Sequence, residues 1–188
     1  VTLSAFGAHI TDRAPTDAYY WTKLGIIAPQ YLVSHFLGYD VAHSAFRAGL
    51  LLLILGSGYV VARVRAPMLV SAMAALLLGL NTVLLGFLGD TYMTGPGLAA
   101  IAVLFALLYL WPLCERGGRT AVSVLIGADF AWLVMIHPQF AIVCAATAAA
   151  FMGGNLLVRT RTTFVVLLWQ ALAVLVGFWT AFTSFIFI

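Results

Sequence analysis

Six apolar runs, each close to the length of one membrane crossing, dominate this sequence. About 20 apolar residues cross a bilayer as an α-helix, and every backbone polar group must then be satisfied within the segment. The runs therefore predict an all-α, polytopic transmembrane helical bundle of about six spans. They cover approximately residues 45–62, 67–88, 97–114, 121–137, 139–158 and 163–186.

The composition leaves too few polar residues for a water-soluble surface. Of the 188 residues, 64% are hydrophobic and 8% are charged, whereas about 25% are charged in a typical soluble domain. The net charge of +3 does not indicate nucleic-acid binding, because the basic residues are scattered instead of following one face. The length fits one transmembrane domain, 1–188, with an outer segment at 1–44 and the six-span bundle at 45–188.

Three pairs of arginines predict how the chain is threaded through the membrane. They lie at positions 63 and 65, 116 and 119, and 159 and 161, and the positive-inside rule places all three pairs in the cytoplasm. Pro138 removes a backbone donor and disfavours helix at His137, which indicates either a kinked helix or a hairpin. Only a hairpin keeps all three pairs on one side, so we predict two separate spans here.

Most of the remaining polar residues then fall on the opposite, outer face. Residues 24–38, interrupted by Pro29, are too short to span and are predicted to form a helix along the outer membrane surface. We expect any chemistry to lie on this face. Its histidines and aspartates are His9, His35, His43, His137, Asp12, Asp17, Asp40 and Asp90.

The densest polar stretch is the outer loop at 11–21, which contains Asp12 and Asp17. A carboxylate held at a membrane face can act as a general base or bind a divalent cation. Lys23 and Arg47 can pair with a phosphate. The alternative is a solvated loop in which Asp17 caps the following helix. Asp90, in the next outer loop, either approaches the first loop or serves only to form a turn.

Asp129 is predicted to lie near the middle of the bilayer, where an ionised carboxylate costs roughly 2.5–3.5 kcal/mol on insertion scales. We expect its side chain to be neutral or paired with a polar group. We favour a buried structural hydrogen bond over a role in a proton path. The histidines are not placed to bind haem. A cation site built from carboxylates and histidines on the outer face is an alternative that the sequence allows. Cys114 and Cys144 lack metal-ligand spacing and are predicted to be packing residues.

The order of these features is similar to that of a known enzyme family. An acidic outer loop leads into an interfacial helix with Pro29, and a span follows from near Arg47 to the segment Arg-Val-Arg-Ala-Pro at 63–67. A second outer loop with Gly89 and Asp90 comes next, and then the hairpin at 127–138. Over most of residues 10–160, this layout resembles the membrane half of GT-C glycosyltransferases, polytopic enzymes that use polyprenyl-phosphate-linked sugars.

The resemblance implies sugar transfer from a polyprenyl-phosphate lipid on the outer face of a membrane, which we expect to be a bacterial plasma membrane. It implies that an acidic residue of the first outer loop is the base. Asp17 and Asp12 both match, and we favour Asp17 because it borders the predicted helix. Asp90 matches a second acidic position of the family. The candidate substrate-binding residues are Lys23, Arg47, Tyr92 and His137.

Two other functions compete with this interpretation. The first is a non-catalytic membrane subunit of a larger respiratory or photosynthetic complex, which the small size and the ring-rich segment at 164–187 favour. The second is a small transporter that uses Asp129, but no internal repeat supports it. GT-C enzymes usually have a full span before the acidic loop and more spans after it. We therefore expect either a part of a longer enzyme or a degenerate relative.

Overall fold

The computed structural model describes residues 24–81, 86, 94–157 and 161–187. Within these residues the chain is helical and contains no strand, which confirms the all-α prediction. The elements are α3 (Leu24–Leu37), α4 (Tyr39–Arg63), α5 (Met68–Gly79), α7 (Thr94–Leu110), the 3₁₀ helix η1 (Trp111–Leu113), α8 (Arg116–Ile136), α9 (Phe140–Leu157) and α10 (Arg161–Phe187).

Four helices in the described part of the chain are long and apolar enough to cross a membrane. They are Val41–Arg63, Thr94–Leu113, Arg116–Ile136 and Val165–Ser184. The outward-facing side chains are also apolar, and Leu69 and Ile142 are among the most exposed. Lipid is the solvent that tolerates such an exterior, so the chain is an integral membrane protein of the helical type. Shorter apolar helices cover Leu24–Leu37, Met68–Gly79 and Phe140–Ala150.

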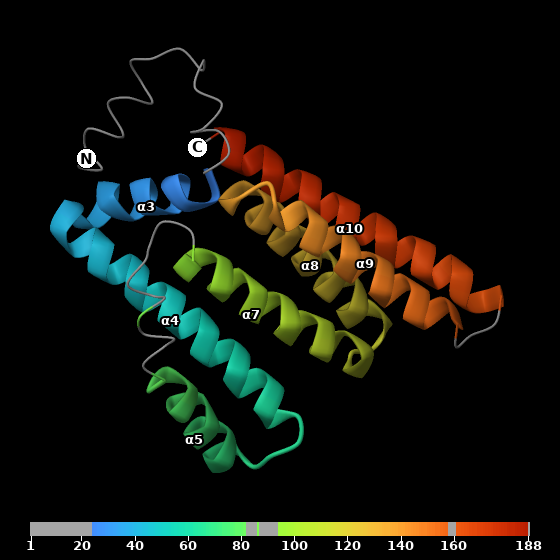
Figure 1. Ribbon diagram of the computed structural model, residues 1–188. Helices are drawn as coiled ribbons and strands as arrows, with labels where there is room; N and C mark the ends of the chain where they lie inside the picture. Colours follow the sequence, from blue (N-terminus) through green and yellow to red (C-terminus); the bar gives the residue numbers. More distant parts are fainter. Residues whose placement is uncertain (1–23, 82–85, 87–93, 158–160, 188) are drawn as a thin grey trace.

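The long helices lie side by side, and α3 crosses one end of the bundle (Figure 1). Helix α5 folds back along α4, and α7 packs between α4 and α8. Helix α4 begins at Tyr39, ahead of the expected start of the first span at residue 45. Gly38 joins α3 to α4 with a φ of 74°. Glycine reaches this left-handed conformation at little cost, and the chain can therefore change direction between the two helices.

The chain reverses at Pro138, as predicted from the positions of the arginine pairs. Helix α8 ends at Ile136 and α9 begins at Phe140, so the chain turns back between two separate helices. As a result, the C-terminal end of α4 and the N-terminal ends of α8 and α10 lie at the same end of the bundle (Figure 1). These ends carry Arg63, Arg116 and Arg161. We call this the arginine end.

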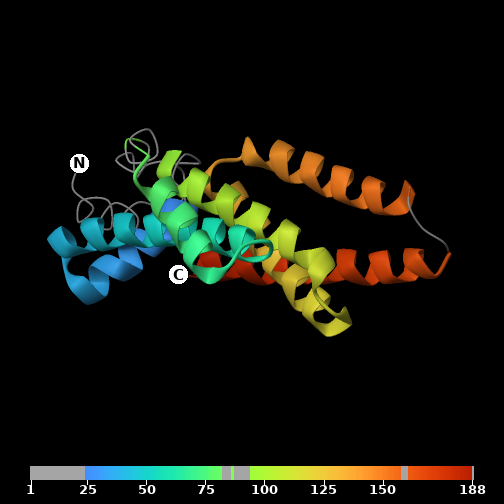
Figure 2. The same ribbon diagram turned by 90° about the horizontal axis from the view of Figure 1, so that it is seen from below.

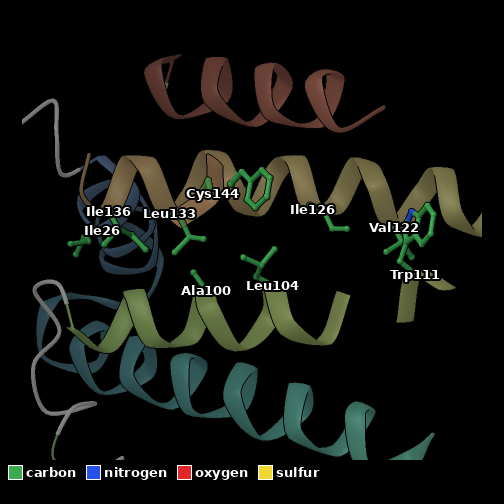
Figure 3. Packing of buried hydrophobic residues seen from close by; sticks show 10 residues of the cluster. Ile26, Ala100, Leu104, Trp111, Val122, Ile126, Leu133, Ile136 and Cys144 are labelled. Atoms are coloured by element: carbon green, nitrogen blue, oxygen red, sulfur yellow. The ribbon is translucent and has the colours of Figure 1, made fainter. Parts of the chain in front are cut away.

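The main core lies between α7 and α8. Ala100 and Leu104 of α7 face Leu133 and Ile126 of α8, and all four side chains are buried (Figure 3). Because the side chain of Ala100 is small, α7 and α8 can pack closely at this position. Ile26 of α3 joins the same cluster, so the crossing helix is part of the core.

Helices α8 and α10 approach each other at the level of their backbones. A Cβ atom added at Gly127 would collide with the carbonyl oxygen of Val174, and one added at Gly177 would collide with the carbonyl oxygen of Val124. Small residues at helix interfaces permit this close approach in membrane proteins. The two glycines therefore fix the distance between α8 and α10.

A buried polar network joins η1, α8 and α10 near the arginine end. The Trp111 Nε1–H donates to Ser123 Oγ at 3.0 Å, and Ser123 Oγ donates to Gln170 Oε1 at 2.7 Å. The amide of Gln170 donates to Thr120 Oγ1 at 3.4 Å. The Arg119 guanidinium lies 5.3 Å from the centre of the Trp111 ring. Buried polar groups that satisfy one another in this way fix the relative register of the helices.

Replacing Gln170 with methionine is expected to destabilise the bundle, because Ser123 loses its acceptor in a buried site. Hydrogen bonds between membrane helices contribute on average about 0.6 kcal/mol and up to about 1.7 kcal/mol. The thermal unfolding midpoint in detergent should fall accordingly. A Ser123→Ala/Gln170→Met double variant should lose less than the sum of the two single losses. Strict additivity would show that the two side chains do not interact.

Candidate functional site

The N-terminal end of α3 is held against the C-terminal end of α8. A Cβ atom added at Gly25 would lie 2.8 Å from the backbone nitrogen of Ile136, so the two backbones are in direct contact. The Trp132 Nε1–H donates to the carbonyl oxygen of Gly25 at 2.8 Å. The start of α3 is therefore fixed both by close approach and by a hydrogen bond.

The start of α7 and the start of α9 meet at the same place. The Phe140 ring lies over Gly97, where an added Cβ atom would be 2.9 Å from Cζ. Ala100 of α7, Ile136 of α8 and Ile26 of α3 are fully or almost fully buried in one cluster (Figure 3). We call the meeting point of these four helix ends the four-helix junction.

Two predicted acidic loops lead directly into this junction. The loop with Asp12 and Asp17 precedes α3, which starts at Leu24, and the loop with Asp90 precedes α7, which starts at Thr94. Five predicted site residues lie outside the described residues. They are Asp12, Asp17, Lys23, Asp90 and Tyr92.

The other two predicted site residues have defined positions. Arg47 lies on α4 with an exposed side chain. His137 is half-buried in the turn between α8 and α9, where the backbone is extended, with a φ of −160° and a ψ of 131°. Its Nδ1 accepts a hydrogen bond from the backbone N–H of Gln139 at 3.3 Å. His137 therefore stands beside Ile136, next to the four-helix junction.

The described part of the chain contains no group of three histidine, cysteine, aspartate or glutamate side chains that could hold a metal ion. The predicted cation site on the outer face combines carboxylates with histidines, and its carboxylates Asp12, Asp17 and Asp90 are outside that part. Asp129 is buried as expected, but both of its carboxylate oxygens lack a hydrogen-bond partner. The structural hydrogen bond that we expected for Asp129 is therefore not formed.

The residues that build the junction could not be predicted from the sequence. Gly25 and Trp132 are far apart in the sequence, and neither belongs to a motif. One signal that could have marked Gly25 is a glycine near the start of an apolar helix, which is common in membrane proteins.

Any function at this junction must be inferred from the arrangement of its helix ends and from the loops that lead into it. Comparison with known proteins adds no further assignment. The chain matches no protein-family model, no curated protein and no solved structure.

Proposed function

We propose that this chain is a membrane glycosyltransferase, or part of one, that moves a sugar from a polyprenyl-phosphate donor to an acceptor. The four-helix junction is the observation that carries the proposal. The helices that follow the two acidic loops begin at Leu24 and Thr94, and both pack on α8. Ile26 in the first turn of α3 and Ala100 in the second turn of α7 belong to one buried cluster with residues of α8. Two loops that end at helices packed on the same helix can bring their carboxylates to one site.

The proposed chemistry uses these carboxylates in different roles. Asp17, or Asp12 in its place, takes the proton from the acceptor hydroxyl as the hydroxyl oxygen attacks the anomeric carbon of the sugar. The bond to the polyprenyl phosphate breaks, and the phosphate leaves with the electron pair. Asp90 is the second acidic group, and it can hold a divalent cation that neutralises the leaving phosphate.

Basic and polar residues near the two loops complete the proposed site. Arg47 and Lys23 pair with the donor phosphate, because a guanidinium or an ammonium group forms charge-assisted hydrogen bonds to phosphate oxygens. His137 and Tyr92 contact the substrates. His137 is suited to this role by its position in the turn beside the junction.

The same proposal includes an arrangement in the membrane. The bundle crosses a bacterial plasma membrane six times, with the arginine end in the cytoplasm and the four-helix junction outside. The position of Arg63, Arg116 and Arg161 at one end of the bundle supports this orientation (Figure 1). Helix α3 lies at the interface, and the exposed apolar side chains of Phe36 and Leu37 support contact with lipid there.

Native mass spectrometry of the protein, released gently from its own membranes, tests the proposal. We expect a co-purifying polyprenyl phosphate, because the donor lipid must bind before transfer. An Arg47→Gln variant should retain less of this lipid, since it loses a phosphate-binding charge, whereas Arg65→Gln at the arginine end should retain the wild-type amount. A protein that carries no polyprenyl phosphate, even after incubation with undecaprenyl phosphate, would contradict the proposal.

A second candidate function is that of a non-catalytic subunit of a larger membrane complex. Helix α9 stands apart from α10 (Figure 2), and its outward side chains include Ile142, which is 74% exposed. A partner helix can pack on such a surface. Partner subunits at fixed stoichiometry, without polyprenyl phosphate, would support this function in the same experiment.

A further inference from the structure

The backbone carbonyl group of Gly25 loses its normal hydrogen-bond partner within α3. In an α-helix, each carbonyl oxygen accepts a hydrogen bond from the N–H group four residues later. For Gly25 this residue is Pro29, which lies inside α3 and has no N–H group. Gly25 is buried, and a buried backbone group without a partner costs about as much free energy as a lost hydrogen bond. The carbonyl group therefore needs a donor from another part of the chain.

The indole of Trp132 on α8 supplies this donor. Its Nε1–H donates to the carbonyl oxygen of Gly25 at 2.8 Å. The backbones of α3 and α8 come this close because Gly25 has no side chain, and an added Cβ atom would lie 2.9 Å from the carbonyl oxygen of Trp132. Pro29 thus leaves open a carbonyl group that Gly25 brings within reach of Trp132. We call the hydrogen bond between these two residues the Gly25–Trp132 contact.

The Trp132 side chain also packs against two buried clusters. The first cluster contains Ile26 of α3 and Ala100 of α7. The second is formed by α4 and α7, through Phe46, Leu50, Ile54 and Ala99. A single side chain of α8 therefore links the start of α3 to both α4 and α7.

These three helices carry or follow residues of the proposed site. The loop with Asp17 precedes α3, and the loop with Asp90 precedes α7. Arg47 lies on α4 directly after Phe46, a member of the second cluster. The relative positions of such groups matter for catalysis, because a displacement of about 1 Å can cost about 100-fold in rate.

We propose that Trp132 is a positioning residue. It donates the hydrogen bond that Pro29 cannot donate to Gly25, and so it holds the start of α3 in one position relative to α4, α7 and α8. Trp132 does not touch the reacting groups and acts through the loop that precedes α3. The catalytic consequence rests on the proposed glycosyltransferase function, whereas the position of α3 does not.

Replacing Trp132 with phenylalanine removes the N–H group and keeps an aromatic ring. The thermal unfolding midpoint in detergent should fall more than in Trp169→Phe, the matched control, whose ring on α10 is 61% exposed. Pro29→Ala restores an N–H group four residues after Gly25. In that background, the decrease caused by Trp132→Phe should be about 2–4 °C smaller. Equal decreases in both backgrounds would overturn the proposal, because the indole would then not replace a missing donor.

The position of α3 is measured separately, as the distance between two spin labels on the protein in lipid nanodiscs. The labels are attached at Phe36→Cys in α3 and Leu125→Cys in α8, where the native side chains are 79% and 53% exposed. The two native cysteines are replaced by alanine. We expect one narrow distance distribution when Trp132 is present, and a broader or shifted distribution in the Trp132→Phe variant. An unchanged distribution would overturn the proposal.

The catalytic consequence is measured with radiolabelled lipid-linked sugars from the source membranes. Trp132→Phe should lower the kcat of transfer by up to about 100-fold and leave the KM for the lipid-linked sugar unchanged, because the displaced loop carries the base. A wild-type kcat in this variant would overturn the positioning role. A wild-type protein that transfers no sugar would instead contradict the proposed function, and the unfolding midpoints and label distances would still decide whether Trp132 holds α3.

Discussion

Adding a single methyl group at Gly127 or Gly177 is expected to unfold the bundle well below the unfolding temperature of the wild-type protein. Each new Cβ atom would collide with a backbone carbonyl oxygen, of Val174 or Val124 respectively. Backbone atoms cannot rotate away as the end of a side chain can, so α8 and α10 must separate. Overpacking in cores costs typically 1–3 kcal/mol and occasionally more, and we expect about 3 kcal/mol or more at these positions.

The thermal unfolding midpoint in detergent measures this effect. A loss of about 3 kcal/mol corresponds to a decrease of roughly 6–12 °C for a chain of this size. Gly56→Ala in α4 is the matched control, because no heavy atom lies within 4 Å of its added Cβ. Alanine is about 1 kcal/mol more favourable than glycine in a helix, so the control should be neutral or more stable. Equal midpoints for Gly127→Ala and Gly56→Ala would show that α8 and α10 are not in backbone contact.

The long helices and the hairpin could be predicted from the sequence because their signals are local. The length of an apolar run predicts whether it forms a span. Pro138 and the arginines on either side of the two spans predict where the chain reverses. Helix α8 ends at Ile136 and α9 begins at Phe140, which agrees with this prediction. Helix α4 begins earlier than expected because a helix can extend beyond its apolar run: it starts at Tyr39 and includes the polar residue His43 ahead of residue 45.

The contacts that assemble these helices could not be predicted, because each joins residues that are distant in the sequence. Gly25 and Trp132 form the α3–α8 contact, and Ser123 and Gln170 link α8 to α10. A glycine or a serine in an apolar run is compatible with many neighbours, and no pattern selects one of them. Asp129 shows the same limit: its burial agrees with the sequence-based expectation of an interior position, whereas its lack of a hydrogen-bond partner depends on the helices that pack around α8.

The candidate site was predicted from residue type and loop position. The helices that follow the two loops begin at Leu24 and Thr94, and both pack on α8, with Ile26 and Ala100 in one buried cluster. Asp12, Asp17 and Asp90 themselves lie outside the described residues. Their roles therefore stay predictions, and they are best tested by activity.

Replacing Asp17 with asparagine is expected to abolish sugar transfer without unfolding the protein. Asparagine keeps the shape of the side chain but cannot take the proton of an acceptor hydroxyl. A positioned general base contributes about 10²- to 10⁴-fold to a rate, so transfer should fall by at least that lower factor. The assay measures the release of polyprenyl phosphate from radiolabelled lipid-linked sugars that are extracted from the source membranes and returned to the full-length protein.

Asp12→Asn in the same loop is the matched control, because it removes the same charge and should leave most of the rate. Both variants should still bind the donor lipid in native mass spectrometry, since the base acts on the acceptor. If Asp12→Asn is inactive and Asp17→Asn is active, the base is Asp12 and the mechanism stands. If both variants transfer sugar at the wild-type rate, the first outer loop does not contain the base, and the acidic residues that precede α3 serve only as a solvated loop or as a contact surface.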